Sequence, residues 1–359
     1  MHTSHALHIG DARDMSAIAA DSVHLVVTSP PYPLVEMWDA AFGELAPASA
    51  AALAADDGMA AFEGMHSALD GVWAECLRVL VPGGFACVNI GDATRSLGGA
   101  FCLFPNQARI VTAFLRLGFT PLPDILWRKP TNAPNKFMGS GMLPAGAYVT
   151  YEHEYVLIFR KGAKRLFSEE GKQLRSESAF FWEERNVWFS DLWTDLRGTG
   201  QRLAPEGPRE RSAAFPFELP YRLIQMYALQ GDTVLDPFAG TGTTLAAALA
   251  SGRSSVGFER MEAFRSLVAE SLHRAVELGR DKAGERLRAH TAFVAERAAQ
   301  GKEIKHLSKQ YGFPVMTRQE LDLRLMVPVA VVARNGRWEA EHEPALLGAP
   351  IGRQSTLFG

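Results

Sequence analysis

Short apolar runs alternate with longer segments of helical periodicity along most of this chain. The runs have the length of strands and lie at 23–28, 85–90, 153–159 and 254–258. Runs without polar alternation are typical of strands that are buried on both faces of a parallel sheet. Apolar residues recur at helical spacing from 62 to 80, before Pro82-Gly83-Gly84, and a second helix is expected at 107–117, before Gly118. The pattern predicts an α/β fold.

A stiff loop follows the first of these strands. The residues Thr28-Ser29-Pro30-Pro31-Tyr32 end the strand abruptly, because proline donates no ladder hydrogen bond and fixes its own φ. The loop offers a hydroxyl, backbone carbonyls without a competing N–H, and an aromatic face. These groups suit a planar substrate with an amino group, bound at Ser29 and a proline carbonyl and stacked on Tyr32. Taken alone, so short a stretch is more often ordinary turn chemistry.

A second stretch, at 233–244, predicts a strand, a glycine-rich turn and the start of a helix. It contains Asp236-Pro237-Phe238-Ala239-Gly240-Thr241-Gly242, and an Ala/Leu-rich run follows at 245–250. α/β folds place nucleotide-like ligands at such a helix N-terminus. No lysine follows the glycines, which excludes a phosphate-binding P-loop, and the third glycine of a dinucleotide-binding loop is missing.

Together the two loops resemble those of the S-adenosylmethionine-dependent amino-methyltransferases of DNA. The resemblance covers most of residues 5–260. The catalytic loop precedes the cofactor loop, as in the circularly permuted group that is called β. Further stretches fit the same group in order: Gly10-Asp11, Val88-Asn89-Ile90-Gly91-Asp92, Trp127-Arg128-Lys129-Pro130, 153–159, Ala214-Phe215-Pro216 and Gly257-Phe258-Glu259.

The resemblance implies a fold, a cofactor and a set of site residues. The fold is a Rossmann-like class I methyltransferase, with a seven-stranded, mostly parallel sheet that contains one antiparallel strand. The cofactor is S-adenosyl-L-methionine and the partner is double-stranded DNA. The residues implied as catalytic are Ser29, Pro30, Pro31 and Tyr32. Those implied for cofactor binding are Asp11, at the adenine amino group, Glu259, at the ribose hydroxyls, and Thr28, Phe215, Pro216, Asp236, Phe238, Ala239, Gly240, Thr241, Gly242, Thr243 and Thr244. For Asp11, a cap of the following helix is the alternative.

The order of these stretches divides the chain into four parts. Residues 1–159 are expected to form the catalytic half of the methyltransferase domain, and 213–303 the cofactor-binding half. Between them, 160–212 interleaves basic with aromatic residues, which suits contact with phosphates and bases. The resembling group places target recognition there; a solvated excursion with its own aromatic cluster is the alternative. Residues 304–359 depart from the family pattern and have no assigned role.

Two segments are expected to flank the site. Residues 39–61 are rich in alanine without a clear period and predict a loosely helical insertion over the active-site mouth. Residues 130–150 carry Pro, Gly and Asn throughout and join the strands 124–129 and 153–159, which are expected to form the antiparallel end of the sheet. The pair His153-Glu154 lacks a second histidine four residues later, so no metal site is predicted.

The cysteines restrict the reaction. Methylation of a cytosine ring carbon needs a thiolate nucleophile. In the family of enzymes that carry out this reaction the cysteine follows a proline, and none of Cys76, Cys87 and Cys102 does. All three lie in apolar sequence and are expected to be buried, reduced thiols. The target is therefore an exocyclic amine. By resemblance, serine at the first position of the loop favours cytosine N4; adenine N6 is the alternative, and an amine of RNA or protein is a more distant one.

The bulk composition adds few restrictions. With 359 residues and 47% apolar content, the chain can bury one large domain and a smaller one. No apolar run approaches the about 18 residues of a membrane span, and the start of the chain shows no secretion signal, so a cytoplasmic protein is expected. A net charge of −3 requires DNA contact to use a local basic surface. The resemblance leaves a cognate restriction endonuclease and a homodimer open as partnerships.

Overall fold

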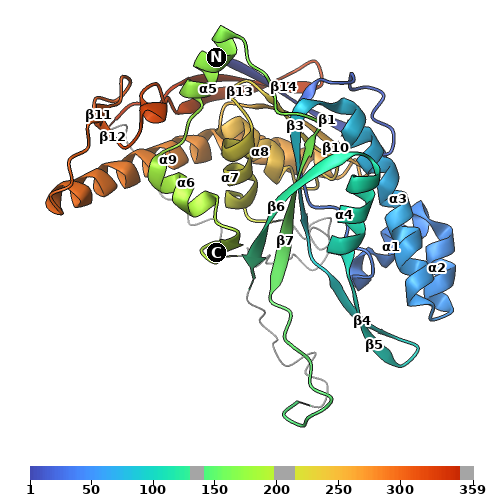
Figure 1. Ribbon diagram of the computed structural model, residues 1–359. Helices are drawn as coiled ribbons and strands as arrows, with labels where there is room; N and C mark the ends of the chain where they lie inside the picture. The colour runs from blue at the N-terminus through green and yellow to red at the C-terminus, as the bar shows by residue number, and fades with distance from the viewer. Residues whose placement is uncertain (130–140, 198–214, 348–359) are drawn as a thin grey trace.

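The computed structural model describes residues 1–129, 141–197 and 215–347. Its main sheet contains β1 (His2–Ile9), β2 (Val23–Thr28), β3 (Leu80–Ile90), β6 (Phe119–Arg128), β7 (His153–Lys161), β8 (Leu192–Trp193), β9 (Thr233–Asp236), β10 (Ser254–Glu259), β13 (Met326–Arg334) and β14 (Arg337–Pro344). Their order across the sheet is β13-β14-β1-β10-β9-β2-β3-β7-β6-β8, and helices lie on both faces (Figure 1).

The central part of this sheet confirms the predicted fold. In the order β1-β10-β9-β2-β3, neighbouring strands are parallel, and β7 runs antiparallel to both β3 and β6. The carboxyl ends of the parallel strands therefore share one edge of the sheet. Because β7 runs the other way, its first residues lie at that same edge.

Two helices cover one face of the sheet: α3 (Gly58–Val79) and α4 (Asn106–Arg116). The predicted helices at 62–80 and 107–117 are thus confirmed. Helix α3 begins four residues earlier than predicted because the Asp57 carboxylate caps it, accepting from the backbone N–H of Ala60 over 3.0 Å. Its buried residues recur every three or four positions: Ala61, Phe62, Met65, His66, Leu69, Val72, Trp73, Cys76 and Val79.

The other face is covered by α7 (Glu218–Tyr227), α8 (Thr243–Ala250) and α9 (Phe264–Ala299). Every residue of α8 from Thr244 onward is buried, because this helix packs against both the sheet and α9. Helix α9 spans 36 residues. Within the described ranges, no helix is both long and apolar enough to cross a membrane.

Two local predictions were wrong, and one pair of strands was not predicted. Pro82-Gly83-Gly84 does not end α3, which stops at Val79; the three residues lie inside β3, where they shift its register against β2. Residues 39–61 are regular rather than loosely helical: they contain α1 (Asp39–Leu45) and α2 (Pro47–Ala54), after the 3-10 turn η1 (Glu36–Trp38). The hairpin of β4 (Ala93–Leu97) and β5 (Ala100–Phe104) was not predicted.

The described part of 160–212 packs closely on the rest of the fold. It contains α5 (Glu169–Glu177), α6 (Trp182–Trp188) and β8, which pairs in parallel with β6. Phe181, Trp188 and Trp193 are buried, so these rings belong to the packed interior and are not free to stack on bases. Residues 198–212 of this segment lie outside the described residues.

The C-terminal extension adds strands to the sheet. Strands β13 and β14 form a hairpin, and β14 pairs antiparallel with β1. Short strands β11 (His306–Leu307) and β12 (Pro314–Val315) precede it. A buried cluster joins this extension to α6 and α9 through Phe181, Ala283, Leu287, Tyr311, Leu323, Leu325, Val327 and Ala345. The described part of 304–359 therefore continues the domain, in contact with the segment before α7.

Candidate active site

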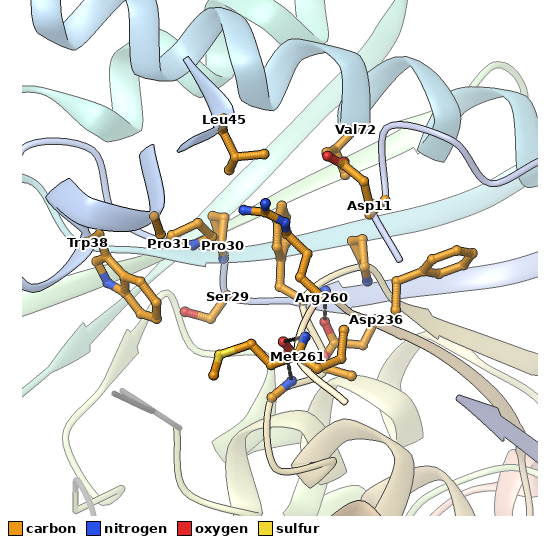
Figure 2. Close-up of a pocket in the computed structure, with 18 of the residues that line it drawn as sticks. Asp11, Ser29, Pro30, Pro31, Trp38, Leu45, Val72, Asp236, Arg260 and Met261 are labelled. Carbon is orange, nitrogen blue, oxygen red and sulfur yellow. Dashed lines mark hydrogen bonds between the residues drawn. The ribbon is translucent and has the colours of Figure 1, made fainter. Parts of the chain in front are cut away.

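A cavity of about 400 Å³, within the usual size of ligand pockets, lies at the carboxyl edge of the parallel strands. The loops after β1, β2, β9 and β10 supply its walls. Figure 2 shows Ser29, Pro30 and Pro31 beside the same cavity as Asp11 and Asp236. The predicted site residues that line it are Asp11, Ser29, Pro30, Pro31, Tyr32, Phe215, Asp236, Phe238, Ala239, Gly240, Thr241, Thr243 and Glu259. Two loops about 200 residues apart in sequence thus enclose one space.

The other predicted cofactor residues, Thr28, Pro216, Gly242 and Thr244, are not among those that line the cavity. Thr28 is fully buried, and its hydroxyl donates to Asp236 Oδ1 over 2.7 Å. Thr244, also fully buried, donates to the carbonyl of Val27 over 3.4 Å. Both threonines tie strand β2 to the segment that contains the glycine-rich loop, so that they fix the relative position of the two walls.

The glycine-rich loop needs its glycines for two different reasons. Gly240 has φ +49°, and a Cβ there would meet nothing closer than the carbonyl oxygen of Phe238 at 4.0 Å, so the space before it belongs to the cavity. Gly242 has φ +81° and caps α8, and a Cβ there would lie 3.1 Å from both methyl groups of Val268. Gly240 thus keeps the pocket open, whereas Gly242 lets α9 approach α8.

Two carboxylates flank this loop. Asp236 ends β9, is 2% exposed, and accepts from the backbone N–H of Phe238 over 3.0 Å. Burial raises the pKa of Asp236 to about 6, and the nearby carboxylate of Glu259 acts in the same direction. Glu259 ends β10; its Oε2 accepts from the N–H of Gly240 over 3.1 Å and its Oε1 from that of Met261 over 3.0 Å.

Asp11 lies in the cavity wall but already has a partner. Both of its carboxylate oxygens accept from the guanidinium of Arg13, at 2.7 to 3.1 Å. It also accepts from the backbone N–H of Arg13, so the carboxylate is part of a local turn. Its wall position matches the prediction, and an amine bound there would share the carboxylate with Arg13.

The helical segment that follows the catalytic loop closes one side of the cavity. Its lining residues include Met37, Trp38, Glu44 and Leu45. Glu44 forms an ion pair at 3.3 Å with Arg260, which comes from the opposite wall (Figure 2 shows Arg260 beside the cavity). The predicted position of 39–61 over the mouth is confirmed for α1.

Sequence reasoning missed three residues behind the loop 28–32, which contact Tyr32 directly or through Glu154. Asn89, Lys129 and Glu154 form a hydrogen-bonded group with the phenol of Tyr32. Glu154 belongs to the stretch 153–159 that fits the family and to a zinc motif that was rejected, but it was given no role of its own. The signal that could have found it is its position at the start of an antiparallel strand, because this places it beside the carboxyl ends of β2 and β3.

The cysteines lie away from this chemistry. Cys76 and Cys87 are fully buried, and burial raises the pKa of both thiols, as expected of inert residues. Cys102, on β5, is exposed, so the prediction of three buried thiols was wrong for this one. Within the described ranges, no group of three His, Cys, Asp or Glu side chains is placed to hold a metal ion.

Comparison with known proteins places this chain in a family. Residues 23–270 match the family model described as DNA methylase. The chain is 49% identical over 330 residues to the Type II methyltransferase M.MthZI of Methanothermobacter thermautotrophicus, covering 91% of this chain and 92% of that one. It is 47% identical over 281 residues to the Type II methyltransferase M.MjaI of Methanocaldococcus jannaschii, covering 75% and 91%.

Solved structures support the same family assignment. A putative DNA modification methylase from Thermus thermophilus, in complex with S-adenosyl-L-methionine, is 34% identical and superposes with a TM-score of 0.60 over 76% of this chain and 94% of its own. The PvuII cytosine-N4-specific methyltransferase, at 18% identity and a TM-score of 0.52, shares the fold. The pocket suits the cofactor of this family, since it combines an open glycine-rich loop with carboxylates for cationic and hydroxyl groups. The chain therefore belongs to the DNA methylase family, the S-adenosylmethionine-dependent amino-methyltransferases of DNA.

Proposed function

We propose that this protein methylates the exocyclic N4 amine of cytosine within a specific DNA sequence. The observation that carries the proposal is that the Ser29 hydroxyl lines the same cavity as the glycine-rich loop. A neutral hydroxyl at this position matches the loop that the β group uses for cytosine. The target base must leave the duplex to reach it, because the amine is otherwise paired and stacked.

The catalytic loop supplies alignment rather than a strong base. The lone pair of an aromatic amine is delocalised into its ring, so the amine is a poor nucleophile. Hydrogen bonds from the amine to Ser29 Oγ and to the carbonyl of Pro30 would draw the nitrogen toward tetrahedral geometry and free its lone pair. The ring of Tyr32, in the same wall, would replace the stacking that the base loses. Holding the reactants at near-attack distance can lower the barrier by roughly 7–11 kcal/mol.

The glycine-rich wall is proposed to hold the cofactor. When bound, S-adenosyl-L-methionine supplies an electrophilic methyl group on a positively charged sulfur. Glu259 would accept hydrogen bonds from its ribose, and Phe238 offers an aromatic face to positive charge. The carboxylate of Asp236 would favour the cationic groups of the ligand.

Cofactor affinity is expected to depend on pH through Asp236. Its pKa is raised to about 6, so the group is neutral below that pH and ionised above it. Since the ionised form attracts the cationic cofactor, the dissociation constant should rise several-fold as the pH falls from 7.5 to 5. Calorimetric titration across this range measures the effect. A much flatter profile is expected for Asp236→Asn, and an equally steep one would assign the dependence to another group.

Replacing Glu259 by alanine should weaken cofactor binding. Hydrogen bonds to a charged acceptor contribute about 1.5–3 kcal/mol each, so the loss of one such bond should raise the dissociation constant roughly 10- to 150-fold. Glu259→Gln keeps one acceptor oxygen, so its dissociation constant for the cofactor should lie between those of the wild type and Glu259→Ala. Calorimetry gives the constants and thermal unfolding reports integrity. An unchanged constant in a folded Glu259→Ala protein would remove this residue from the site.

The two relatives compared above are Type II methyltransferases. Their names support a proposal for the biological role of this protein as well. Methylation of a fixed sequence would protect DNA from a restriction endonuclease that cuts the same sequence. Expression in a bacterial strain without DNA methylation of its own, followed by sequencing that detects modified bases by polymerase kinetics, tests this function. N4-methylcytosine at one recurring motif is expected. N6-methyladenine at such a motif would replace the base assignment, and unmodified DNA would refute the function.

A further inference from the structure

A chain of hydrogen bonds leads from Ser29 away from the cavity. Ser29 Oγ donates to Tyr32 Oη over 3.1 Å, and Tyr32 Oη donates to Glu154 Oε2 over 3.0 Å. Asn89 Nδ2 donates to the Tyr32 oxygen over 2.8 Å and to Glu154 Oε2 over 2.7 Å. The other carboxylate oxygen, Oε1, contacts Lys129 Nζ at 2.7 Å. The chain therefore starts at the proposed substrate contact and ends at a carboxylate.

The sheet topology positions the residues of this hydrogen-bond series. Asn89 lies near the end of β3, and Glu154 lies near the start of β7, which pairs antiparallel with β3. Both side chains thus lie beside the loop that follows β2. Gly91 packs against the side chains of Tyr32 and Glu154. A Cβ at this position would lie 3.2 Å from Tyr32 Cε2 and 3.3 Å from Glu154 Cγ. The close approach shows that the phenol and the carboxylate are tightly confined.

The Glu154 carboxylate determines the direction in which protons are donated along this series of hydrogen bonds. Burial, and then the charge of Glu154, raise the pKa of Tyr32 well above its ordinary value, so the phenol keeps its proton. That proton is donated to Glu154, and the Tyr32 oxygen accepts from Asn89 and Ser29. Because the Ser29 proton points toward Tyr32, the lone pairs of Ser29 Oγ remain available to the cavity. Ser29 is thereby held as an acceptor for an amine N–H.

A structural ion pair does not account for this arrangement. The Glu154 side chain is 13% exposed, whereas Lys129 is 46% exposed, and pairs with an exposed partner contribute little to stability. Keeping a largely buried carboxylate costs free energy unless hydrogen bonds compensate. Here the compensating donors are Tyr32 and Asn89, and both point the network toward the catalytic loop.

We propose that Glu154 is the terminal proton acceptor of the reaction, reached from the substrate amine through Ser29 and Tyr32. The inference rests on the proposed function. As the new N–C bond forms, the C–S bond breaks and sulfur keeps its electron pair, which leaves the nitrogen positively charged. The nitrogen then releases a proton to Ser29 Oγ. The hydroxyl proton of Ser29 passes to Tyr32 Oη, and the phenol proton passes to Glu154 Oε2.

The proton balance closes after one turnover. The product amine is neutral, Ser29 and Tyr32 have each exchanged one proton for another, and Glu154 has become a neutral acid. Its remaining exposure allows the proton to return to water. An alkylated, protonated aromatic amine is a strong acid, so a carboxylate is a sufficient base. The chain thus supplies the partner base that an isolated serine would lack.

The variant Glu154→Gln separates proton acceptance from geometry. Glutamine keeps the size and an oxygen that accepts from Tyr32, but it is not a base. With saturating DNA and cofactor, the single-turnover rate of methyl transfer should fall about 10²-fold, while the calorimetric dissociation constant of the cofactor stays within about twofold of the wild type. Tyr32→Phe should lose a similar factor. The double variant should be no slower than either single one, because both interrupt one chain.

A solvent-isotope measurement distinguishes a relay from a packing effect. In mixtures of light and heavy water, the wild-type rate should depend on deuterium content in a curved manner, because several protons move, and Tyr32→Phe should lose the curvature. Glu152→Gln is the matched control, since Glu152 lies two residues earlier and pairs with Arg128 at 3.5 Å, outside the chain. Its rate should remain unchanged.

Two results would overturn the relay. A Glu154→Gln protein with the wild-type single-turnover rate would show that the carboxylate accepts no proton that matters. A parallel loss of cofactor binding or of thermal stability, large enough to explain the slower rate, would assign Glu154 a structural role. In both cases the wild type would still label DNA, so that the proposed function would stand; absence of label from the wild type would refute the function itself.

Discussion

Replacing Tyr32 by alanine is expected to lower the rate of methyl transfer by at least about 500-fold while cofactor affinity changes by less than about threefold. Stacking of an extruded base on an aromatic ring contributes about 1–3 kcal/mol, which alone corresponds to roughly 5- to 150-fold. The same substitution removes the phenol that links Ser29 to Glu154. The two losses multiply. Single-turnover assays give the rate, and calorimetry gives the cofactor constant.

Tyr32→Phe is the matched control for this prediction. It keeps the ring and removes only the hydroxyl, so its rate should lie between those of the wild type and Tyr32→Ala. Thermal unfolding of all three proteins checks that the catalytic loop remains folded. If Tyr32→Ala bound the cofactor as poorly as a variant with a filled pocket, the assignment of Tyr32 to the substrate base would be wrong.

A tryptophan in place of Gly240 is expected to raise the cofactor dissociation constant by at least about 100-fold, or about 2.7 kcal/mol. Gly240 lines the cavity, and the space in front of its Cα is open, so a large side chain would occupy the volume that the ligand needs. The Gly240 N–H, which donates to Glu259, would also be displaced. Calorimetric titration with S-adenosyl-L-methionine measures the loss.

Gly231→Trp controls for backbone strain. Gly231 has φ +79°, a Cβ there would meet nothing within 4 Å, and the residue does not line the cavity. Both variants therefore carry a left-handed residue, which costs roughly 1–2 kcal/mol, but only Gly240→Trp fills the pocket. Equal cofactor binding by the two variants would mean that the ligand lies elsewhere.

The architecture was readable from the sequence because its signals are local. The apolar runs at 23–28 and 254–258 became β2 and β10, and the glycine-rich turn at 240–242 begins α8 as predicted. The expectation of a mostly parallel sheet with one antiparallel strand came from the family resemblance, whereas the order of the strands was not predicted. Pro82-Gly83-Gly84 misled because the same residues that end helices also form strand irregularities, and pairing with β2 decided between the two.

Only part of the candidate site could be predicted from the sequence. Loop residues such as Ser29 and Gly240 carry sequence signals, because prolines and glycines constrain the backbone there. Glu154 carries only the signal of its position at the start of an antiparallel strand, because its proposed role depends on a contact with Tyr32, 122 positions away in the sequence. Composition likewise cannot reveal which aromatic residues of 160–212 pack inward, as Trp188 and Trp193 do.

The most direct test of the account is mass spectrometry of nucleosides from DNA incubated with the purified protein and S-adenosyl-L-methionine labelled in its methyl group. The account predicts label in N4-methylcytosine, abolished in Ser29→Ala and strongly reduced in Glu154→Gln. Label in N6-methyladenine would keep the fold and the relay but overturn the role given to Ser29 in choosing cytosine. Cofactor binding without label in any nucleoside would contradict the account.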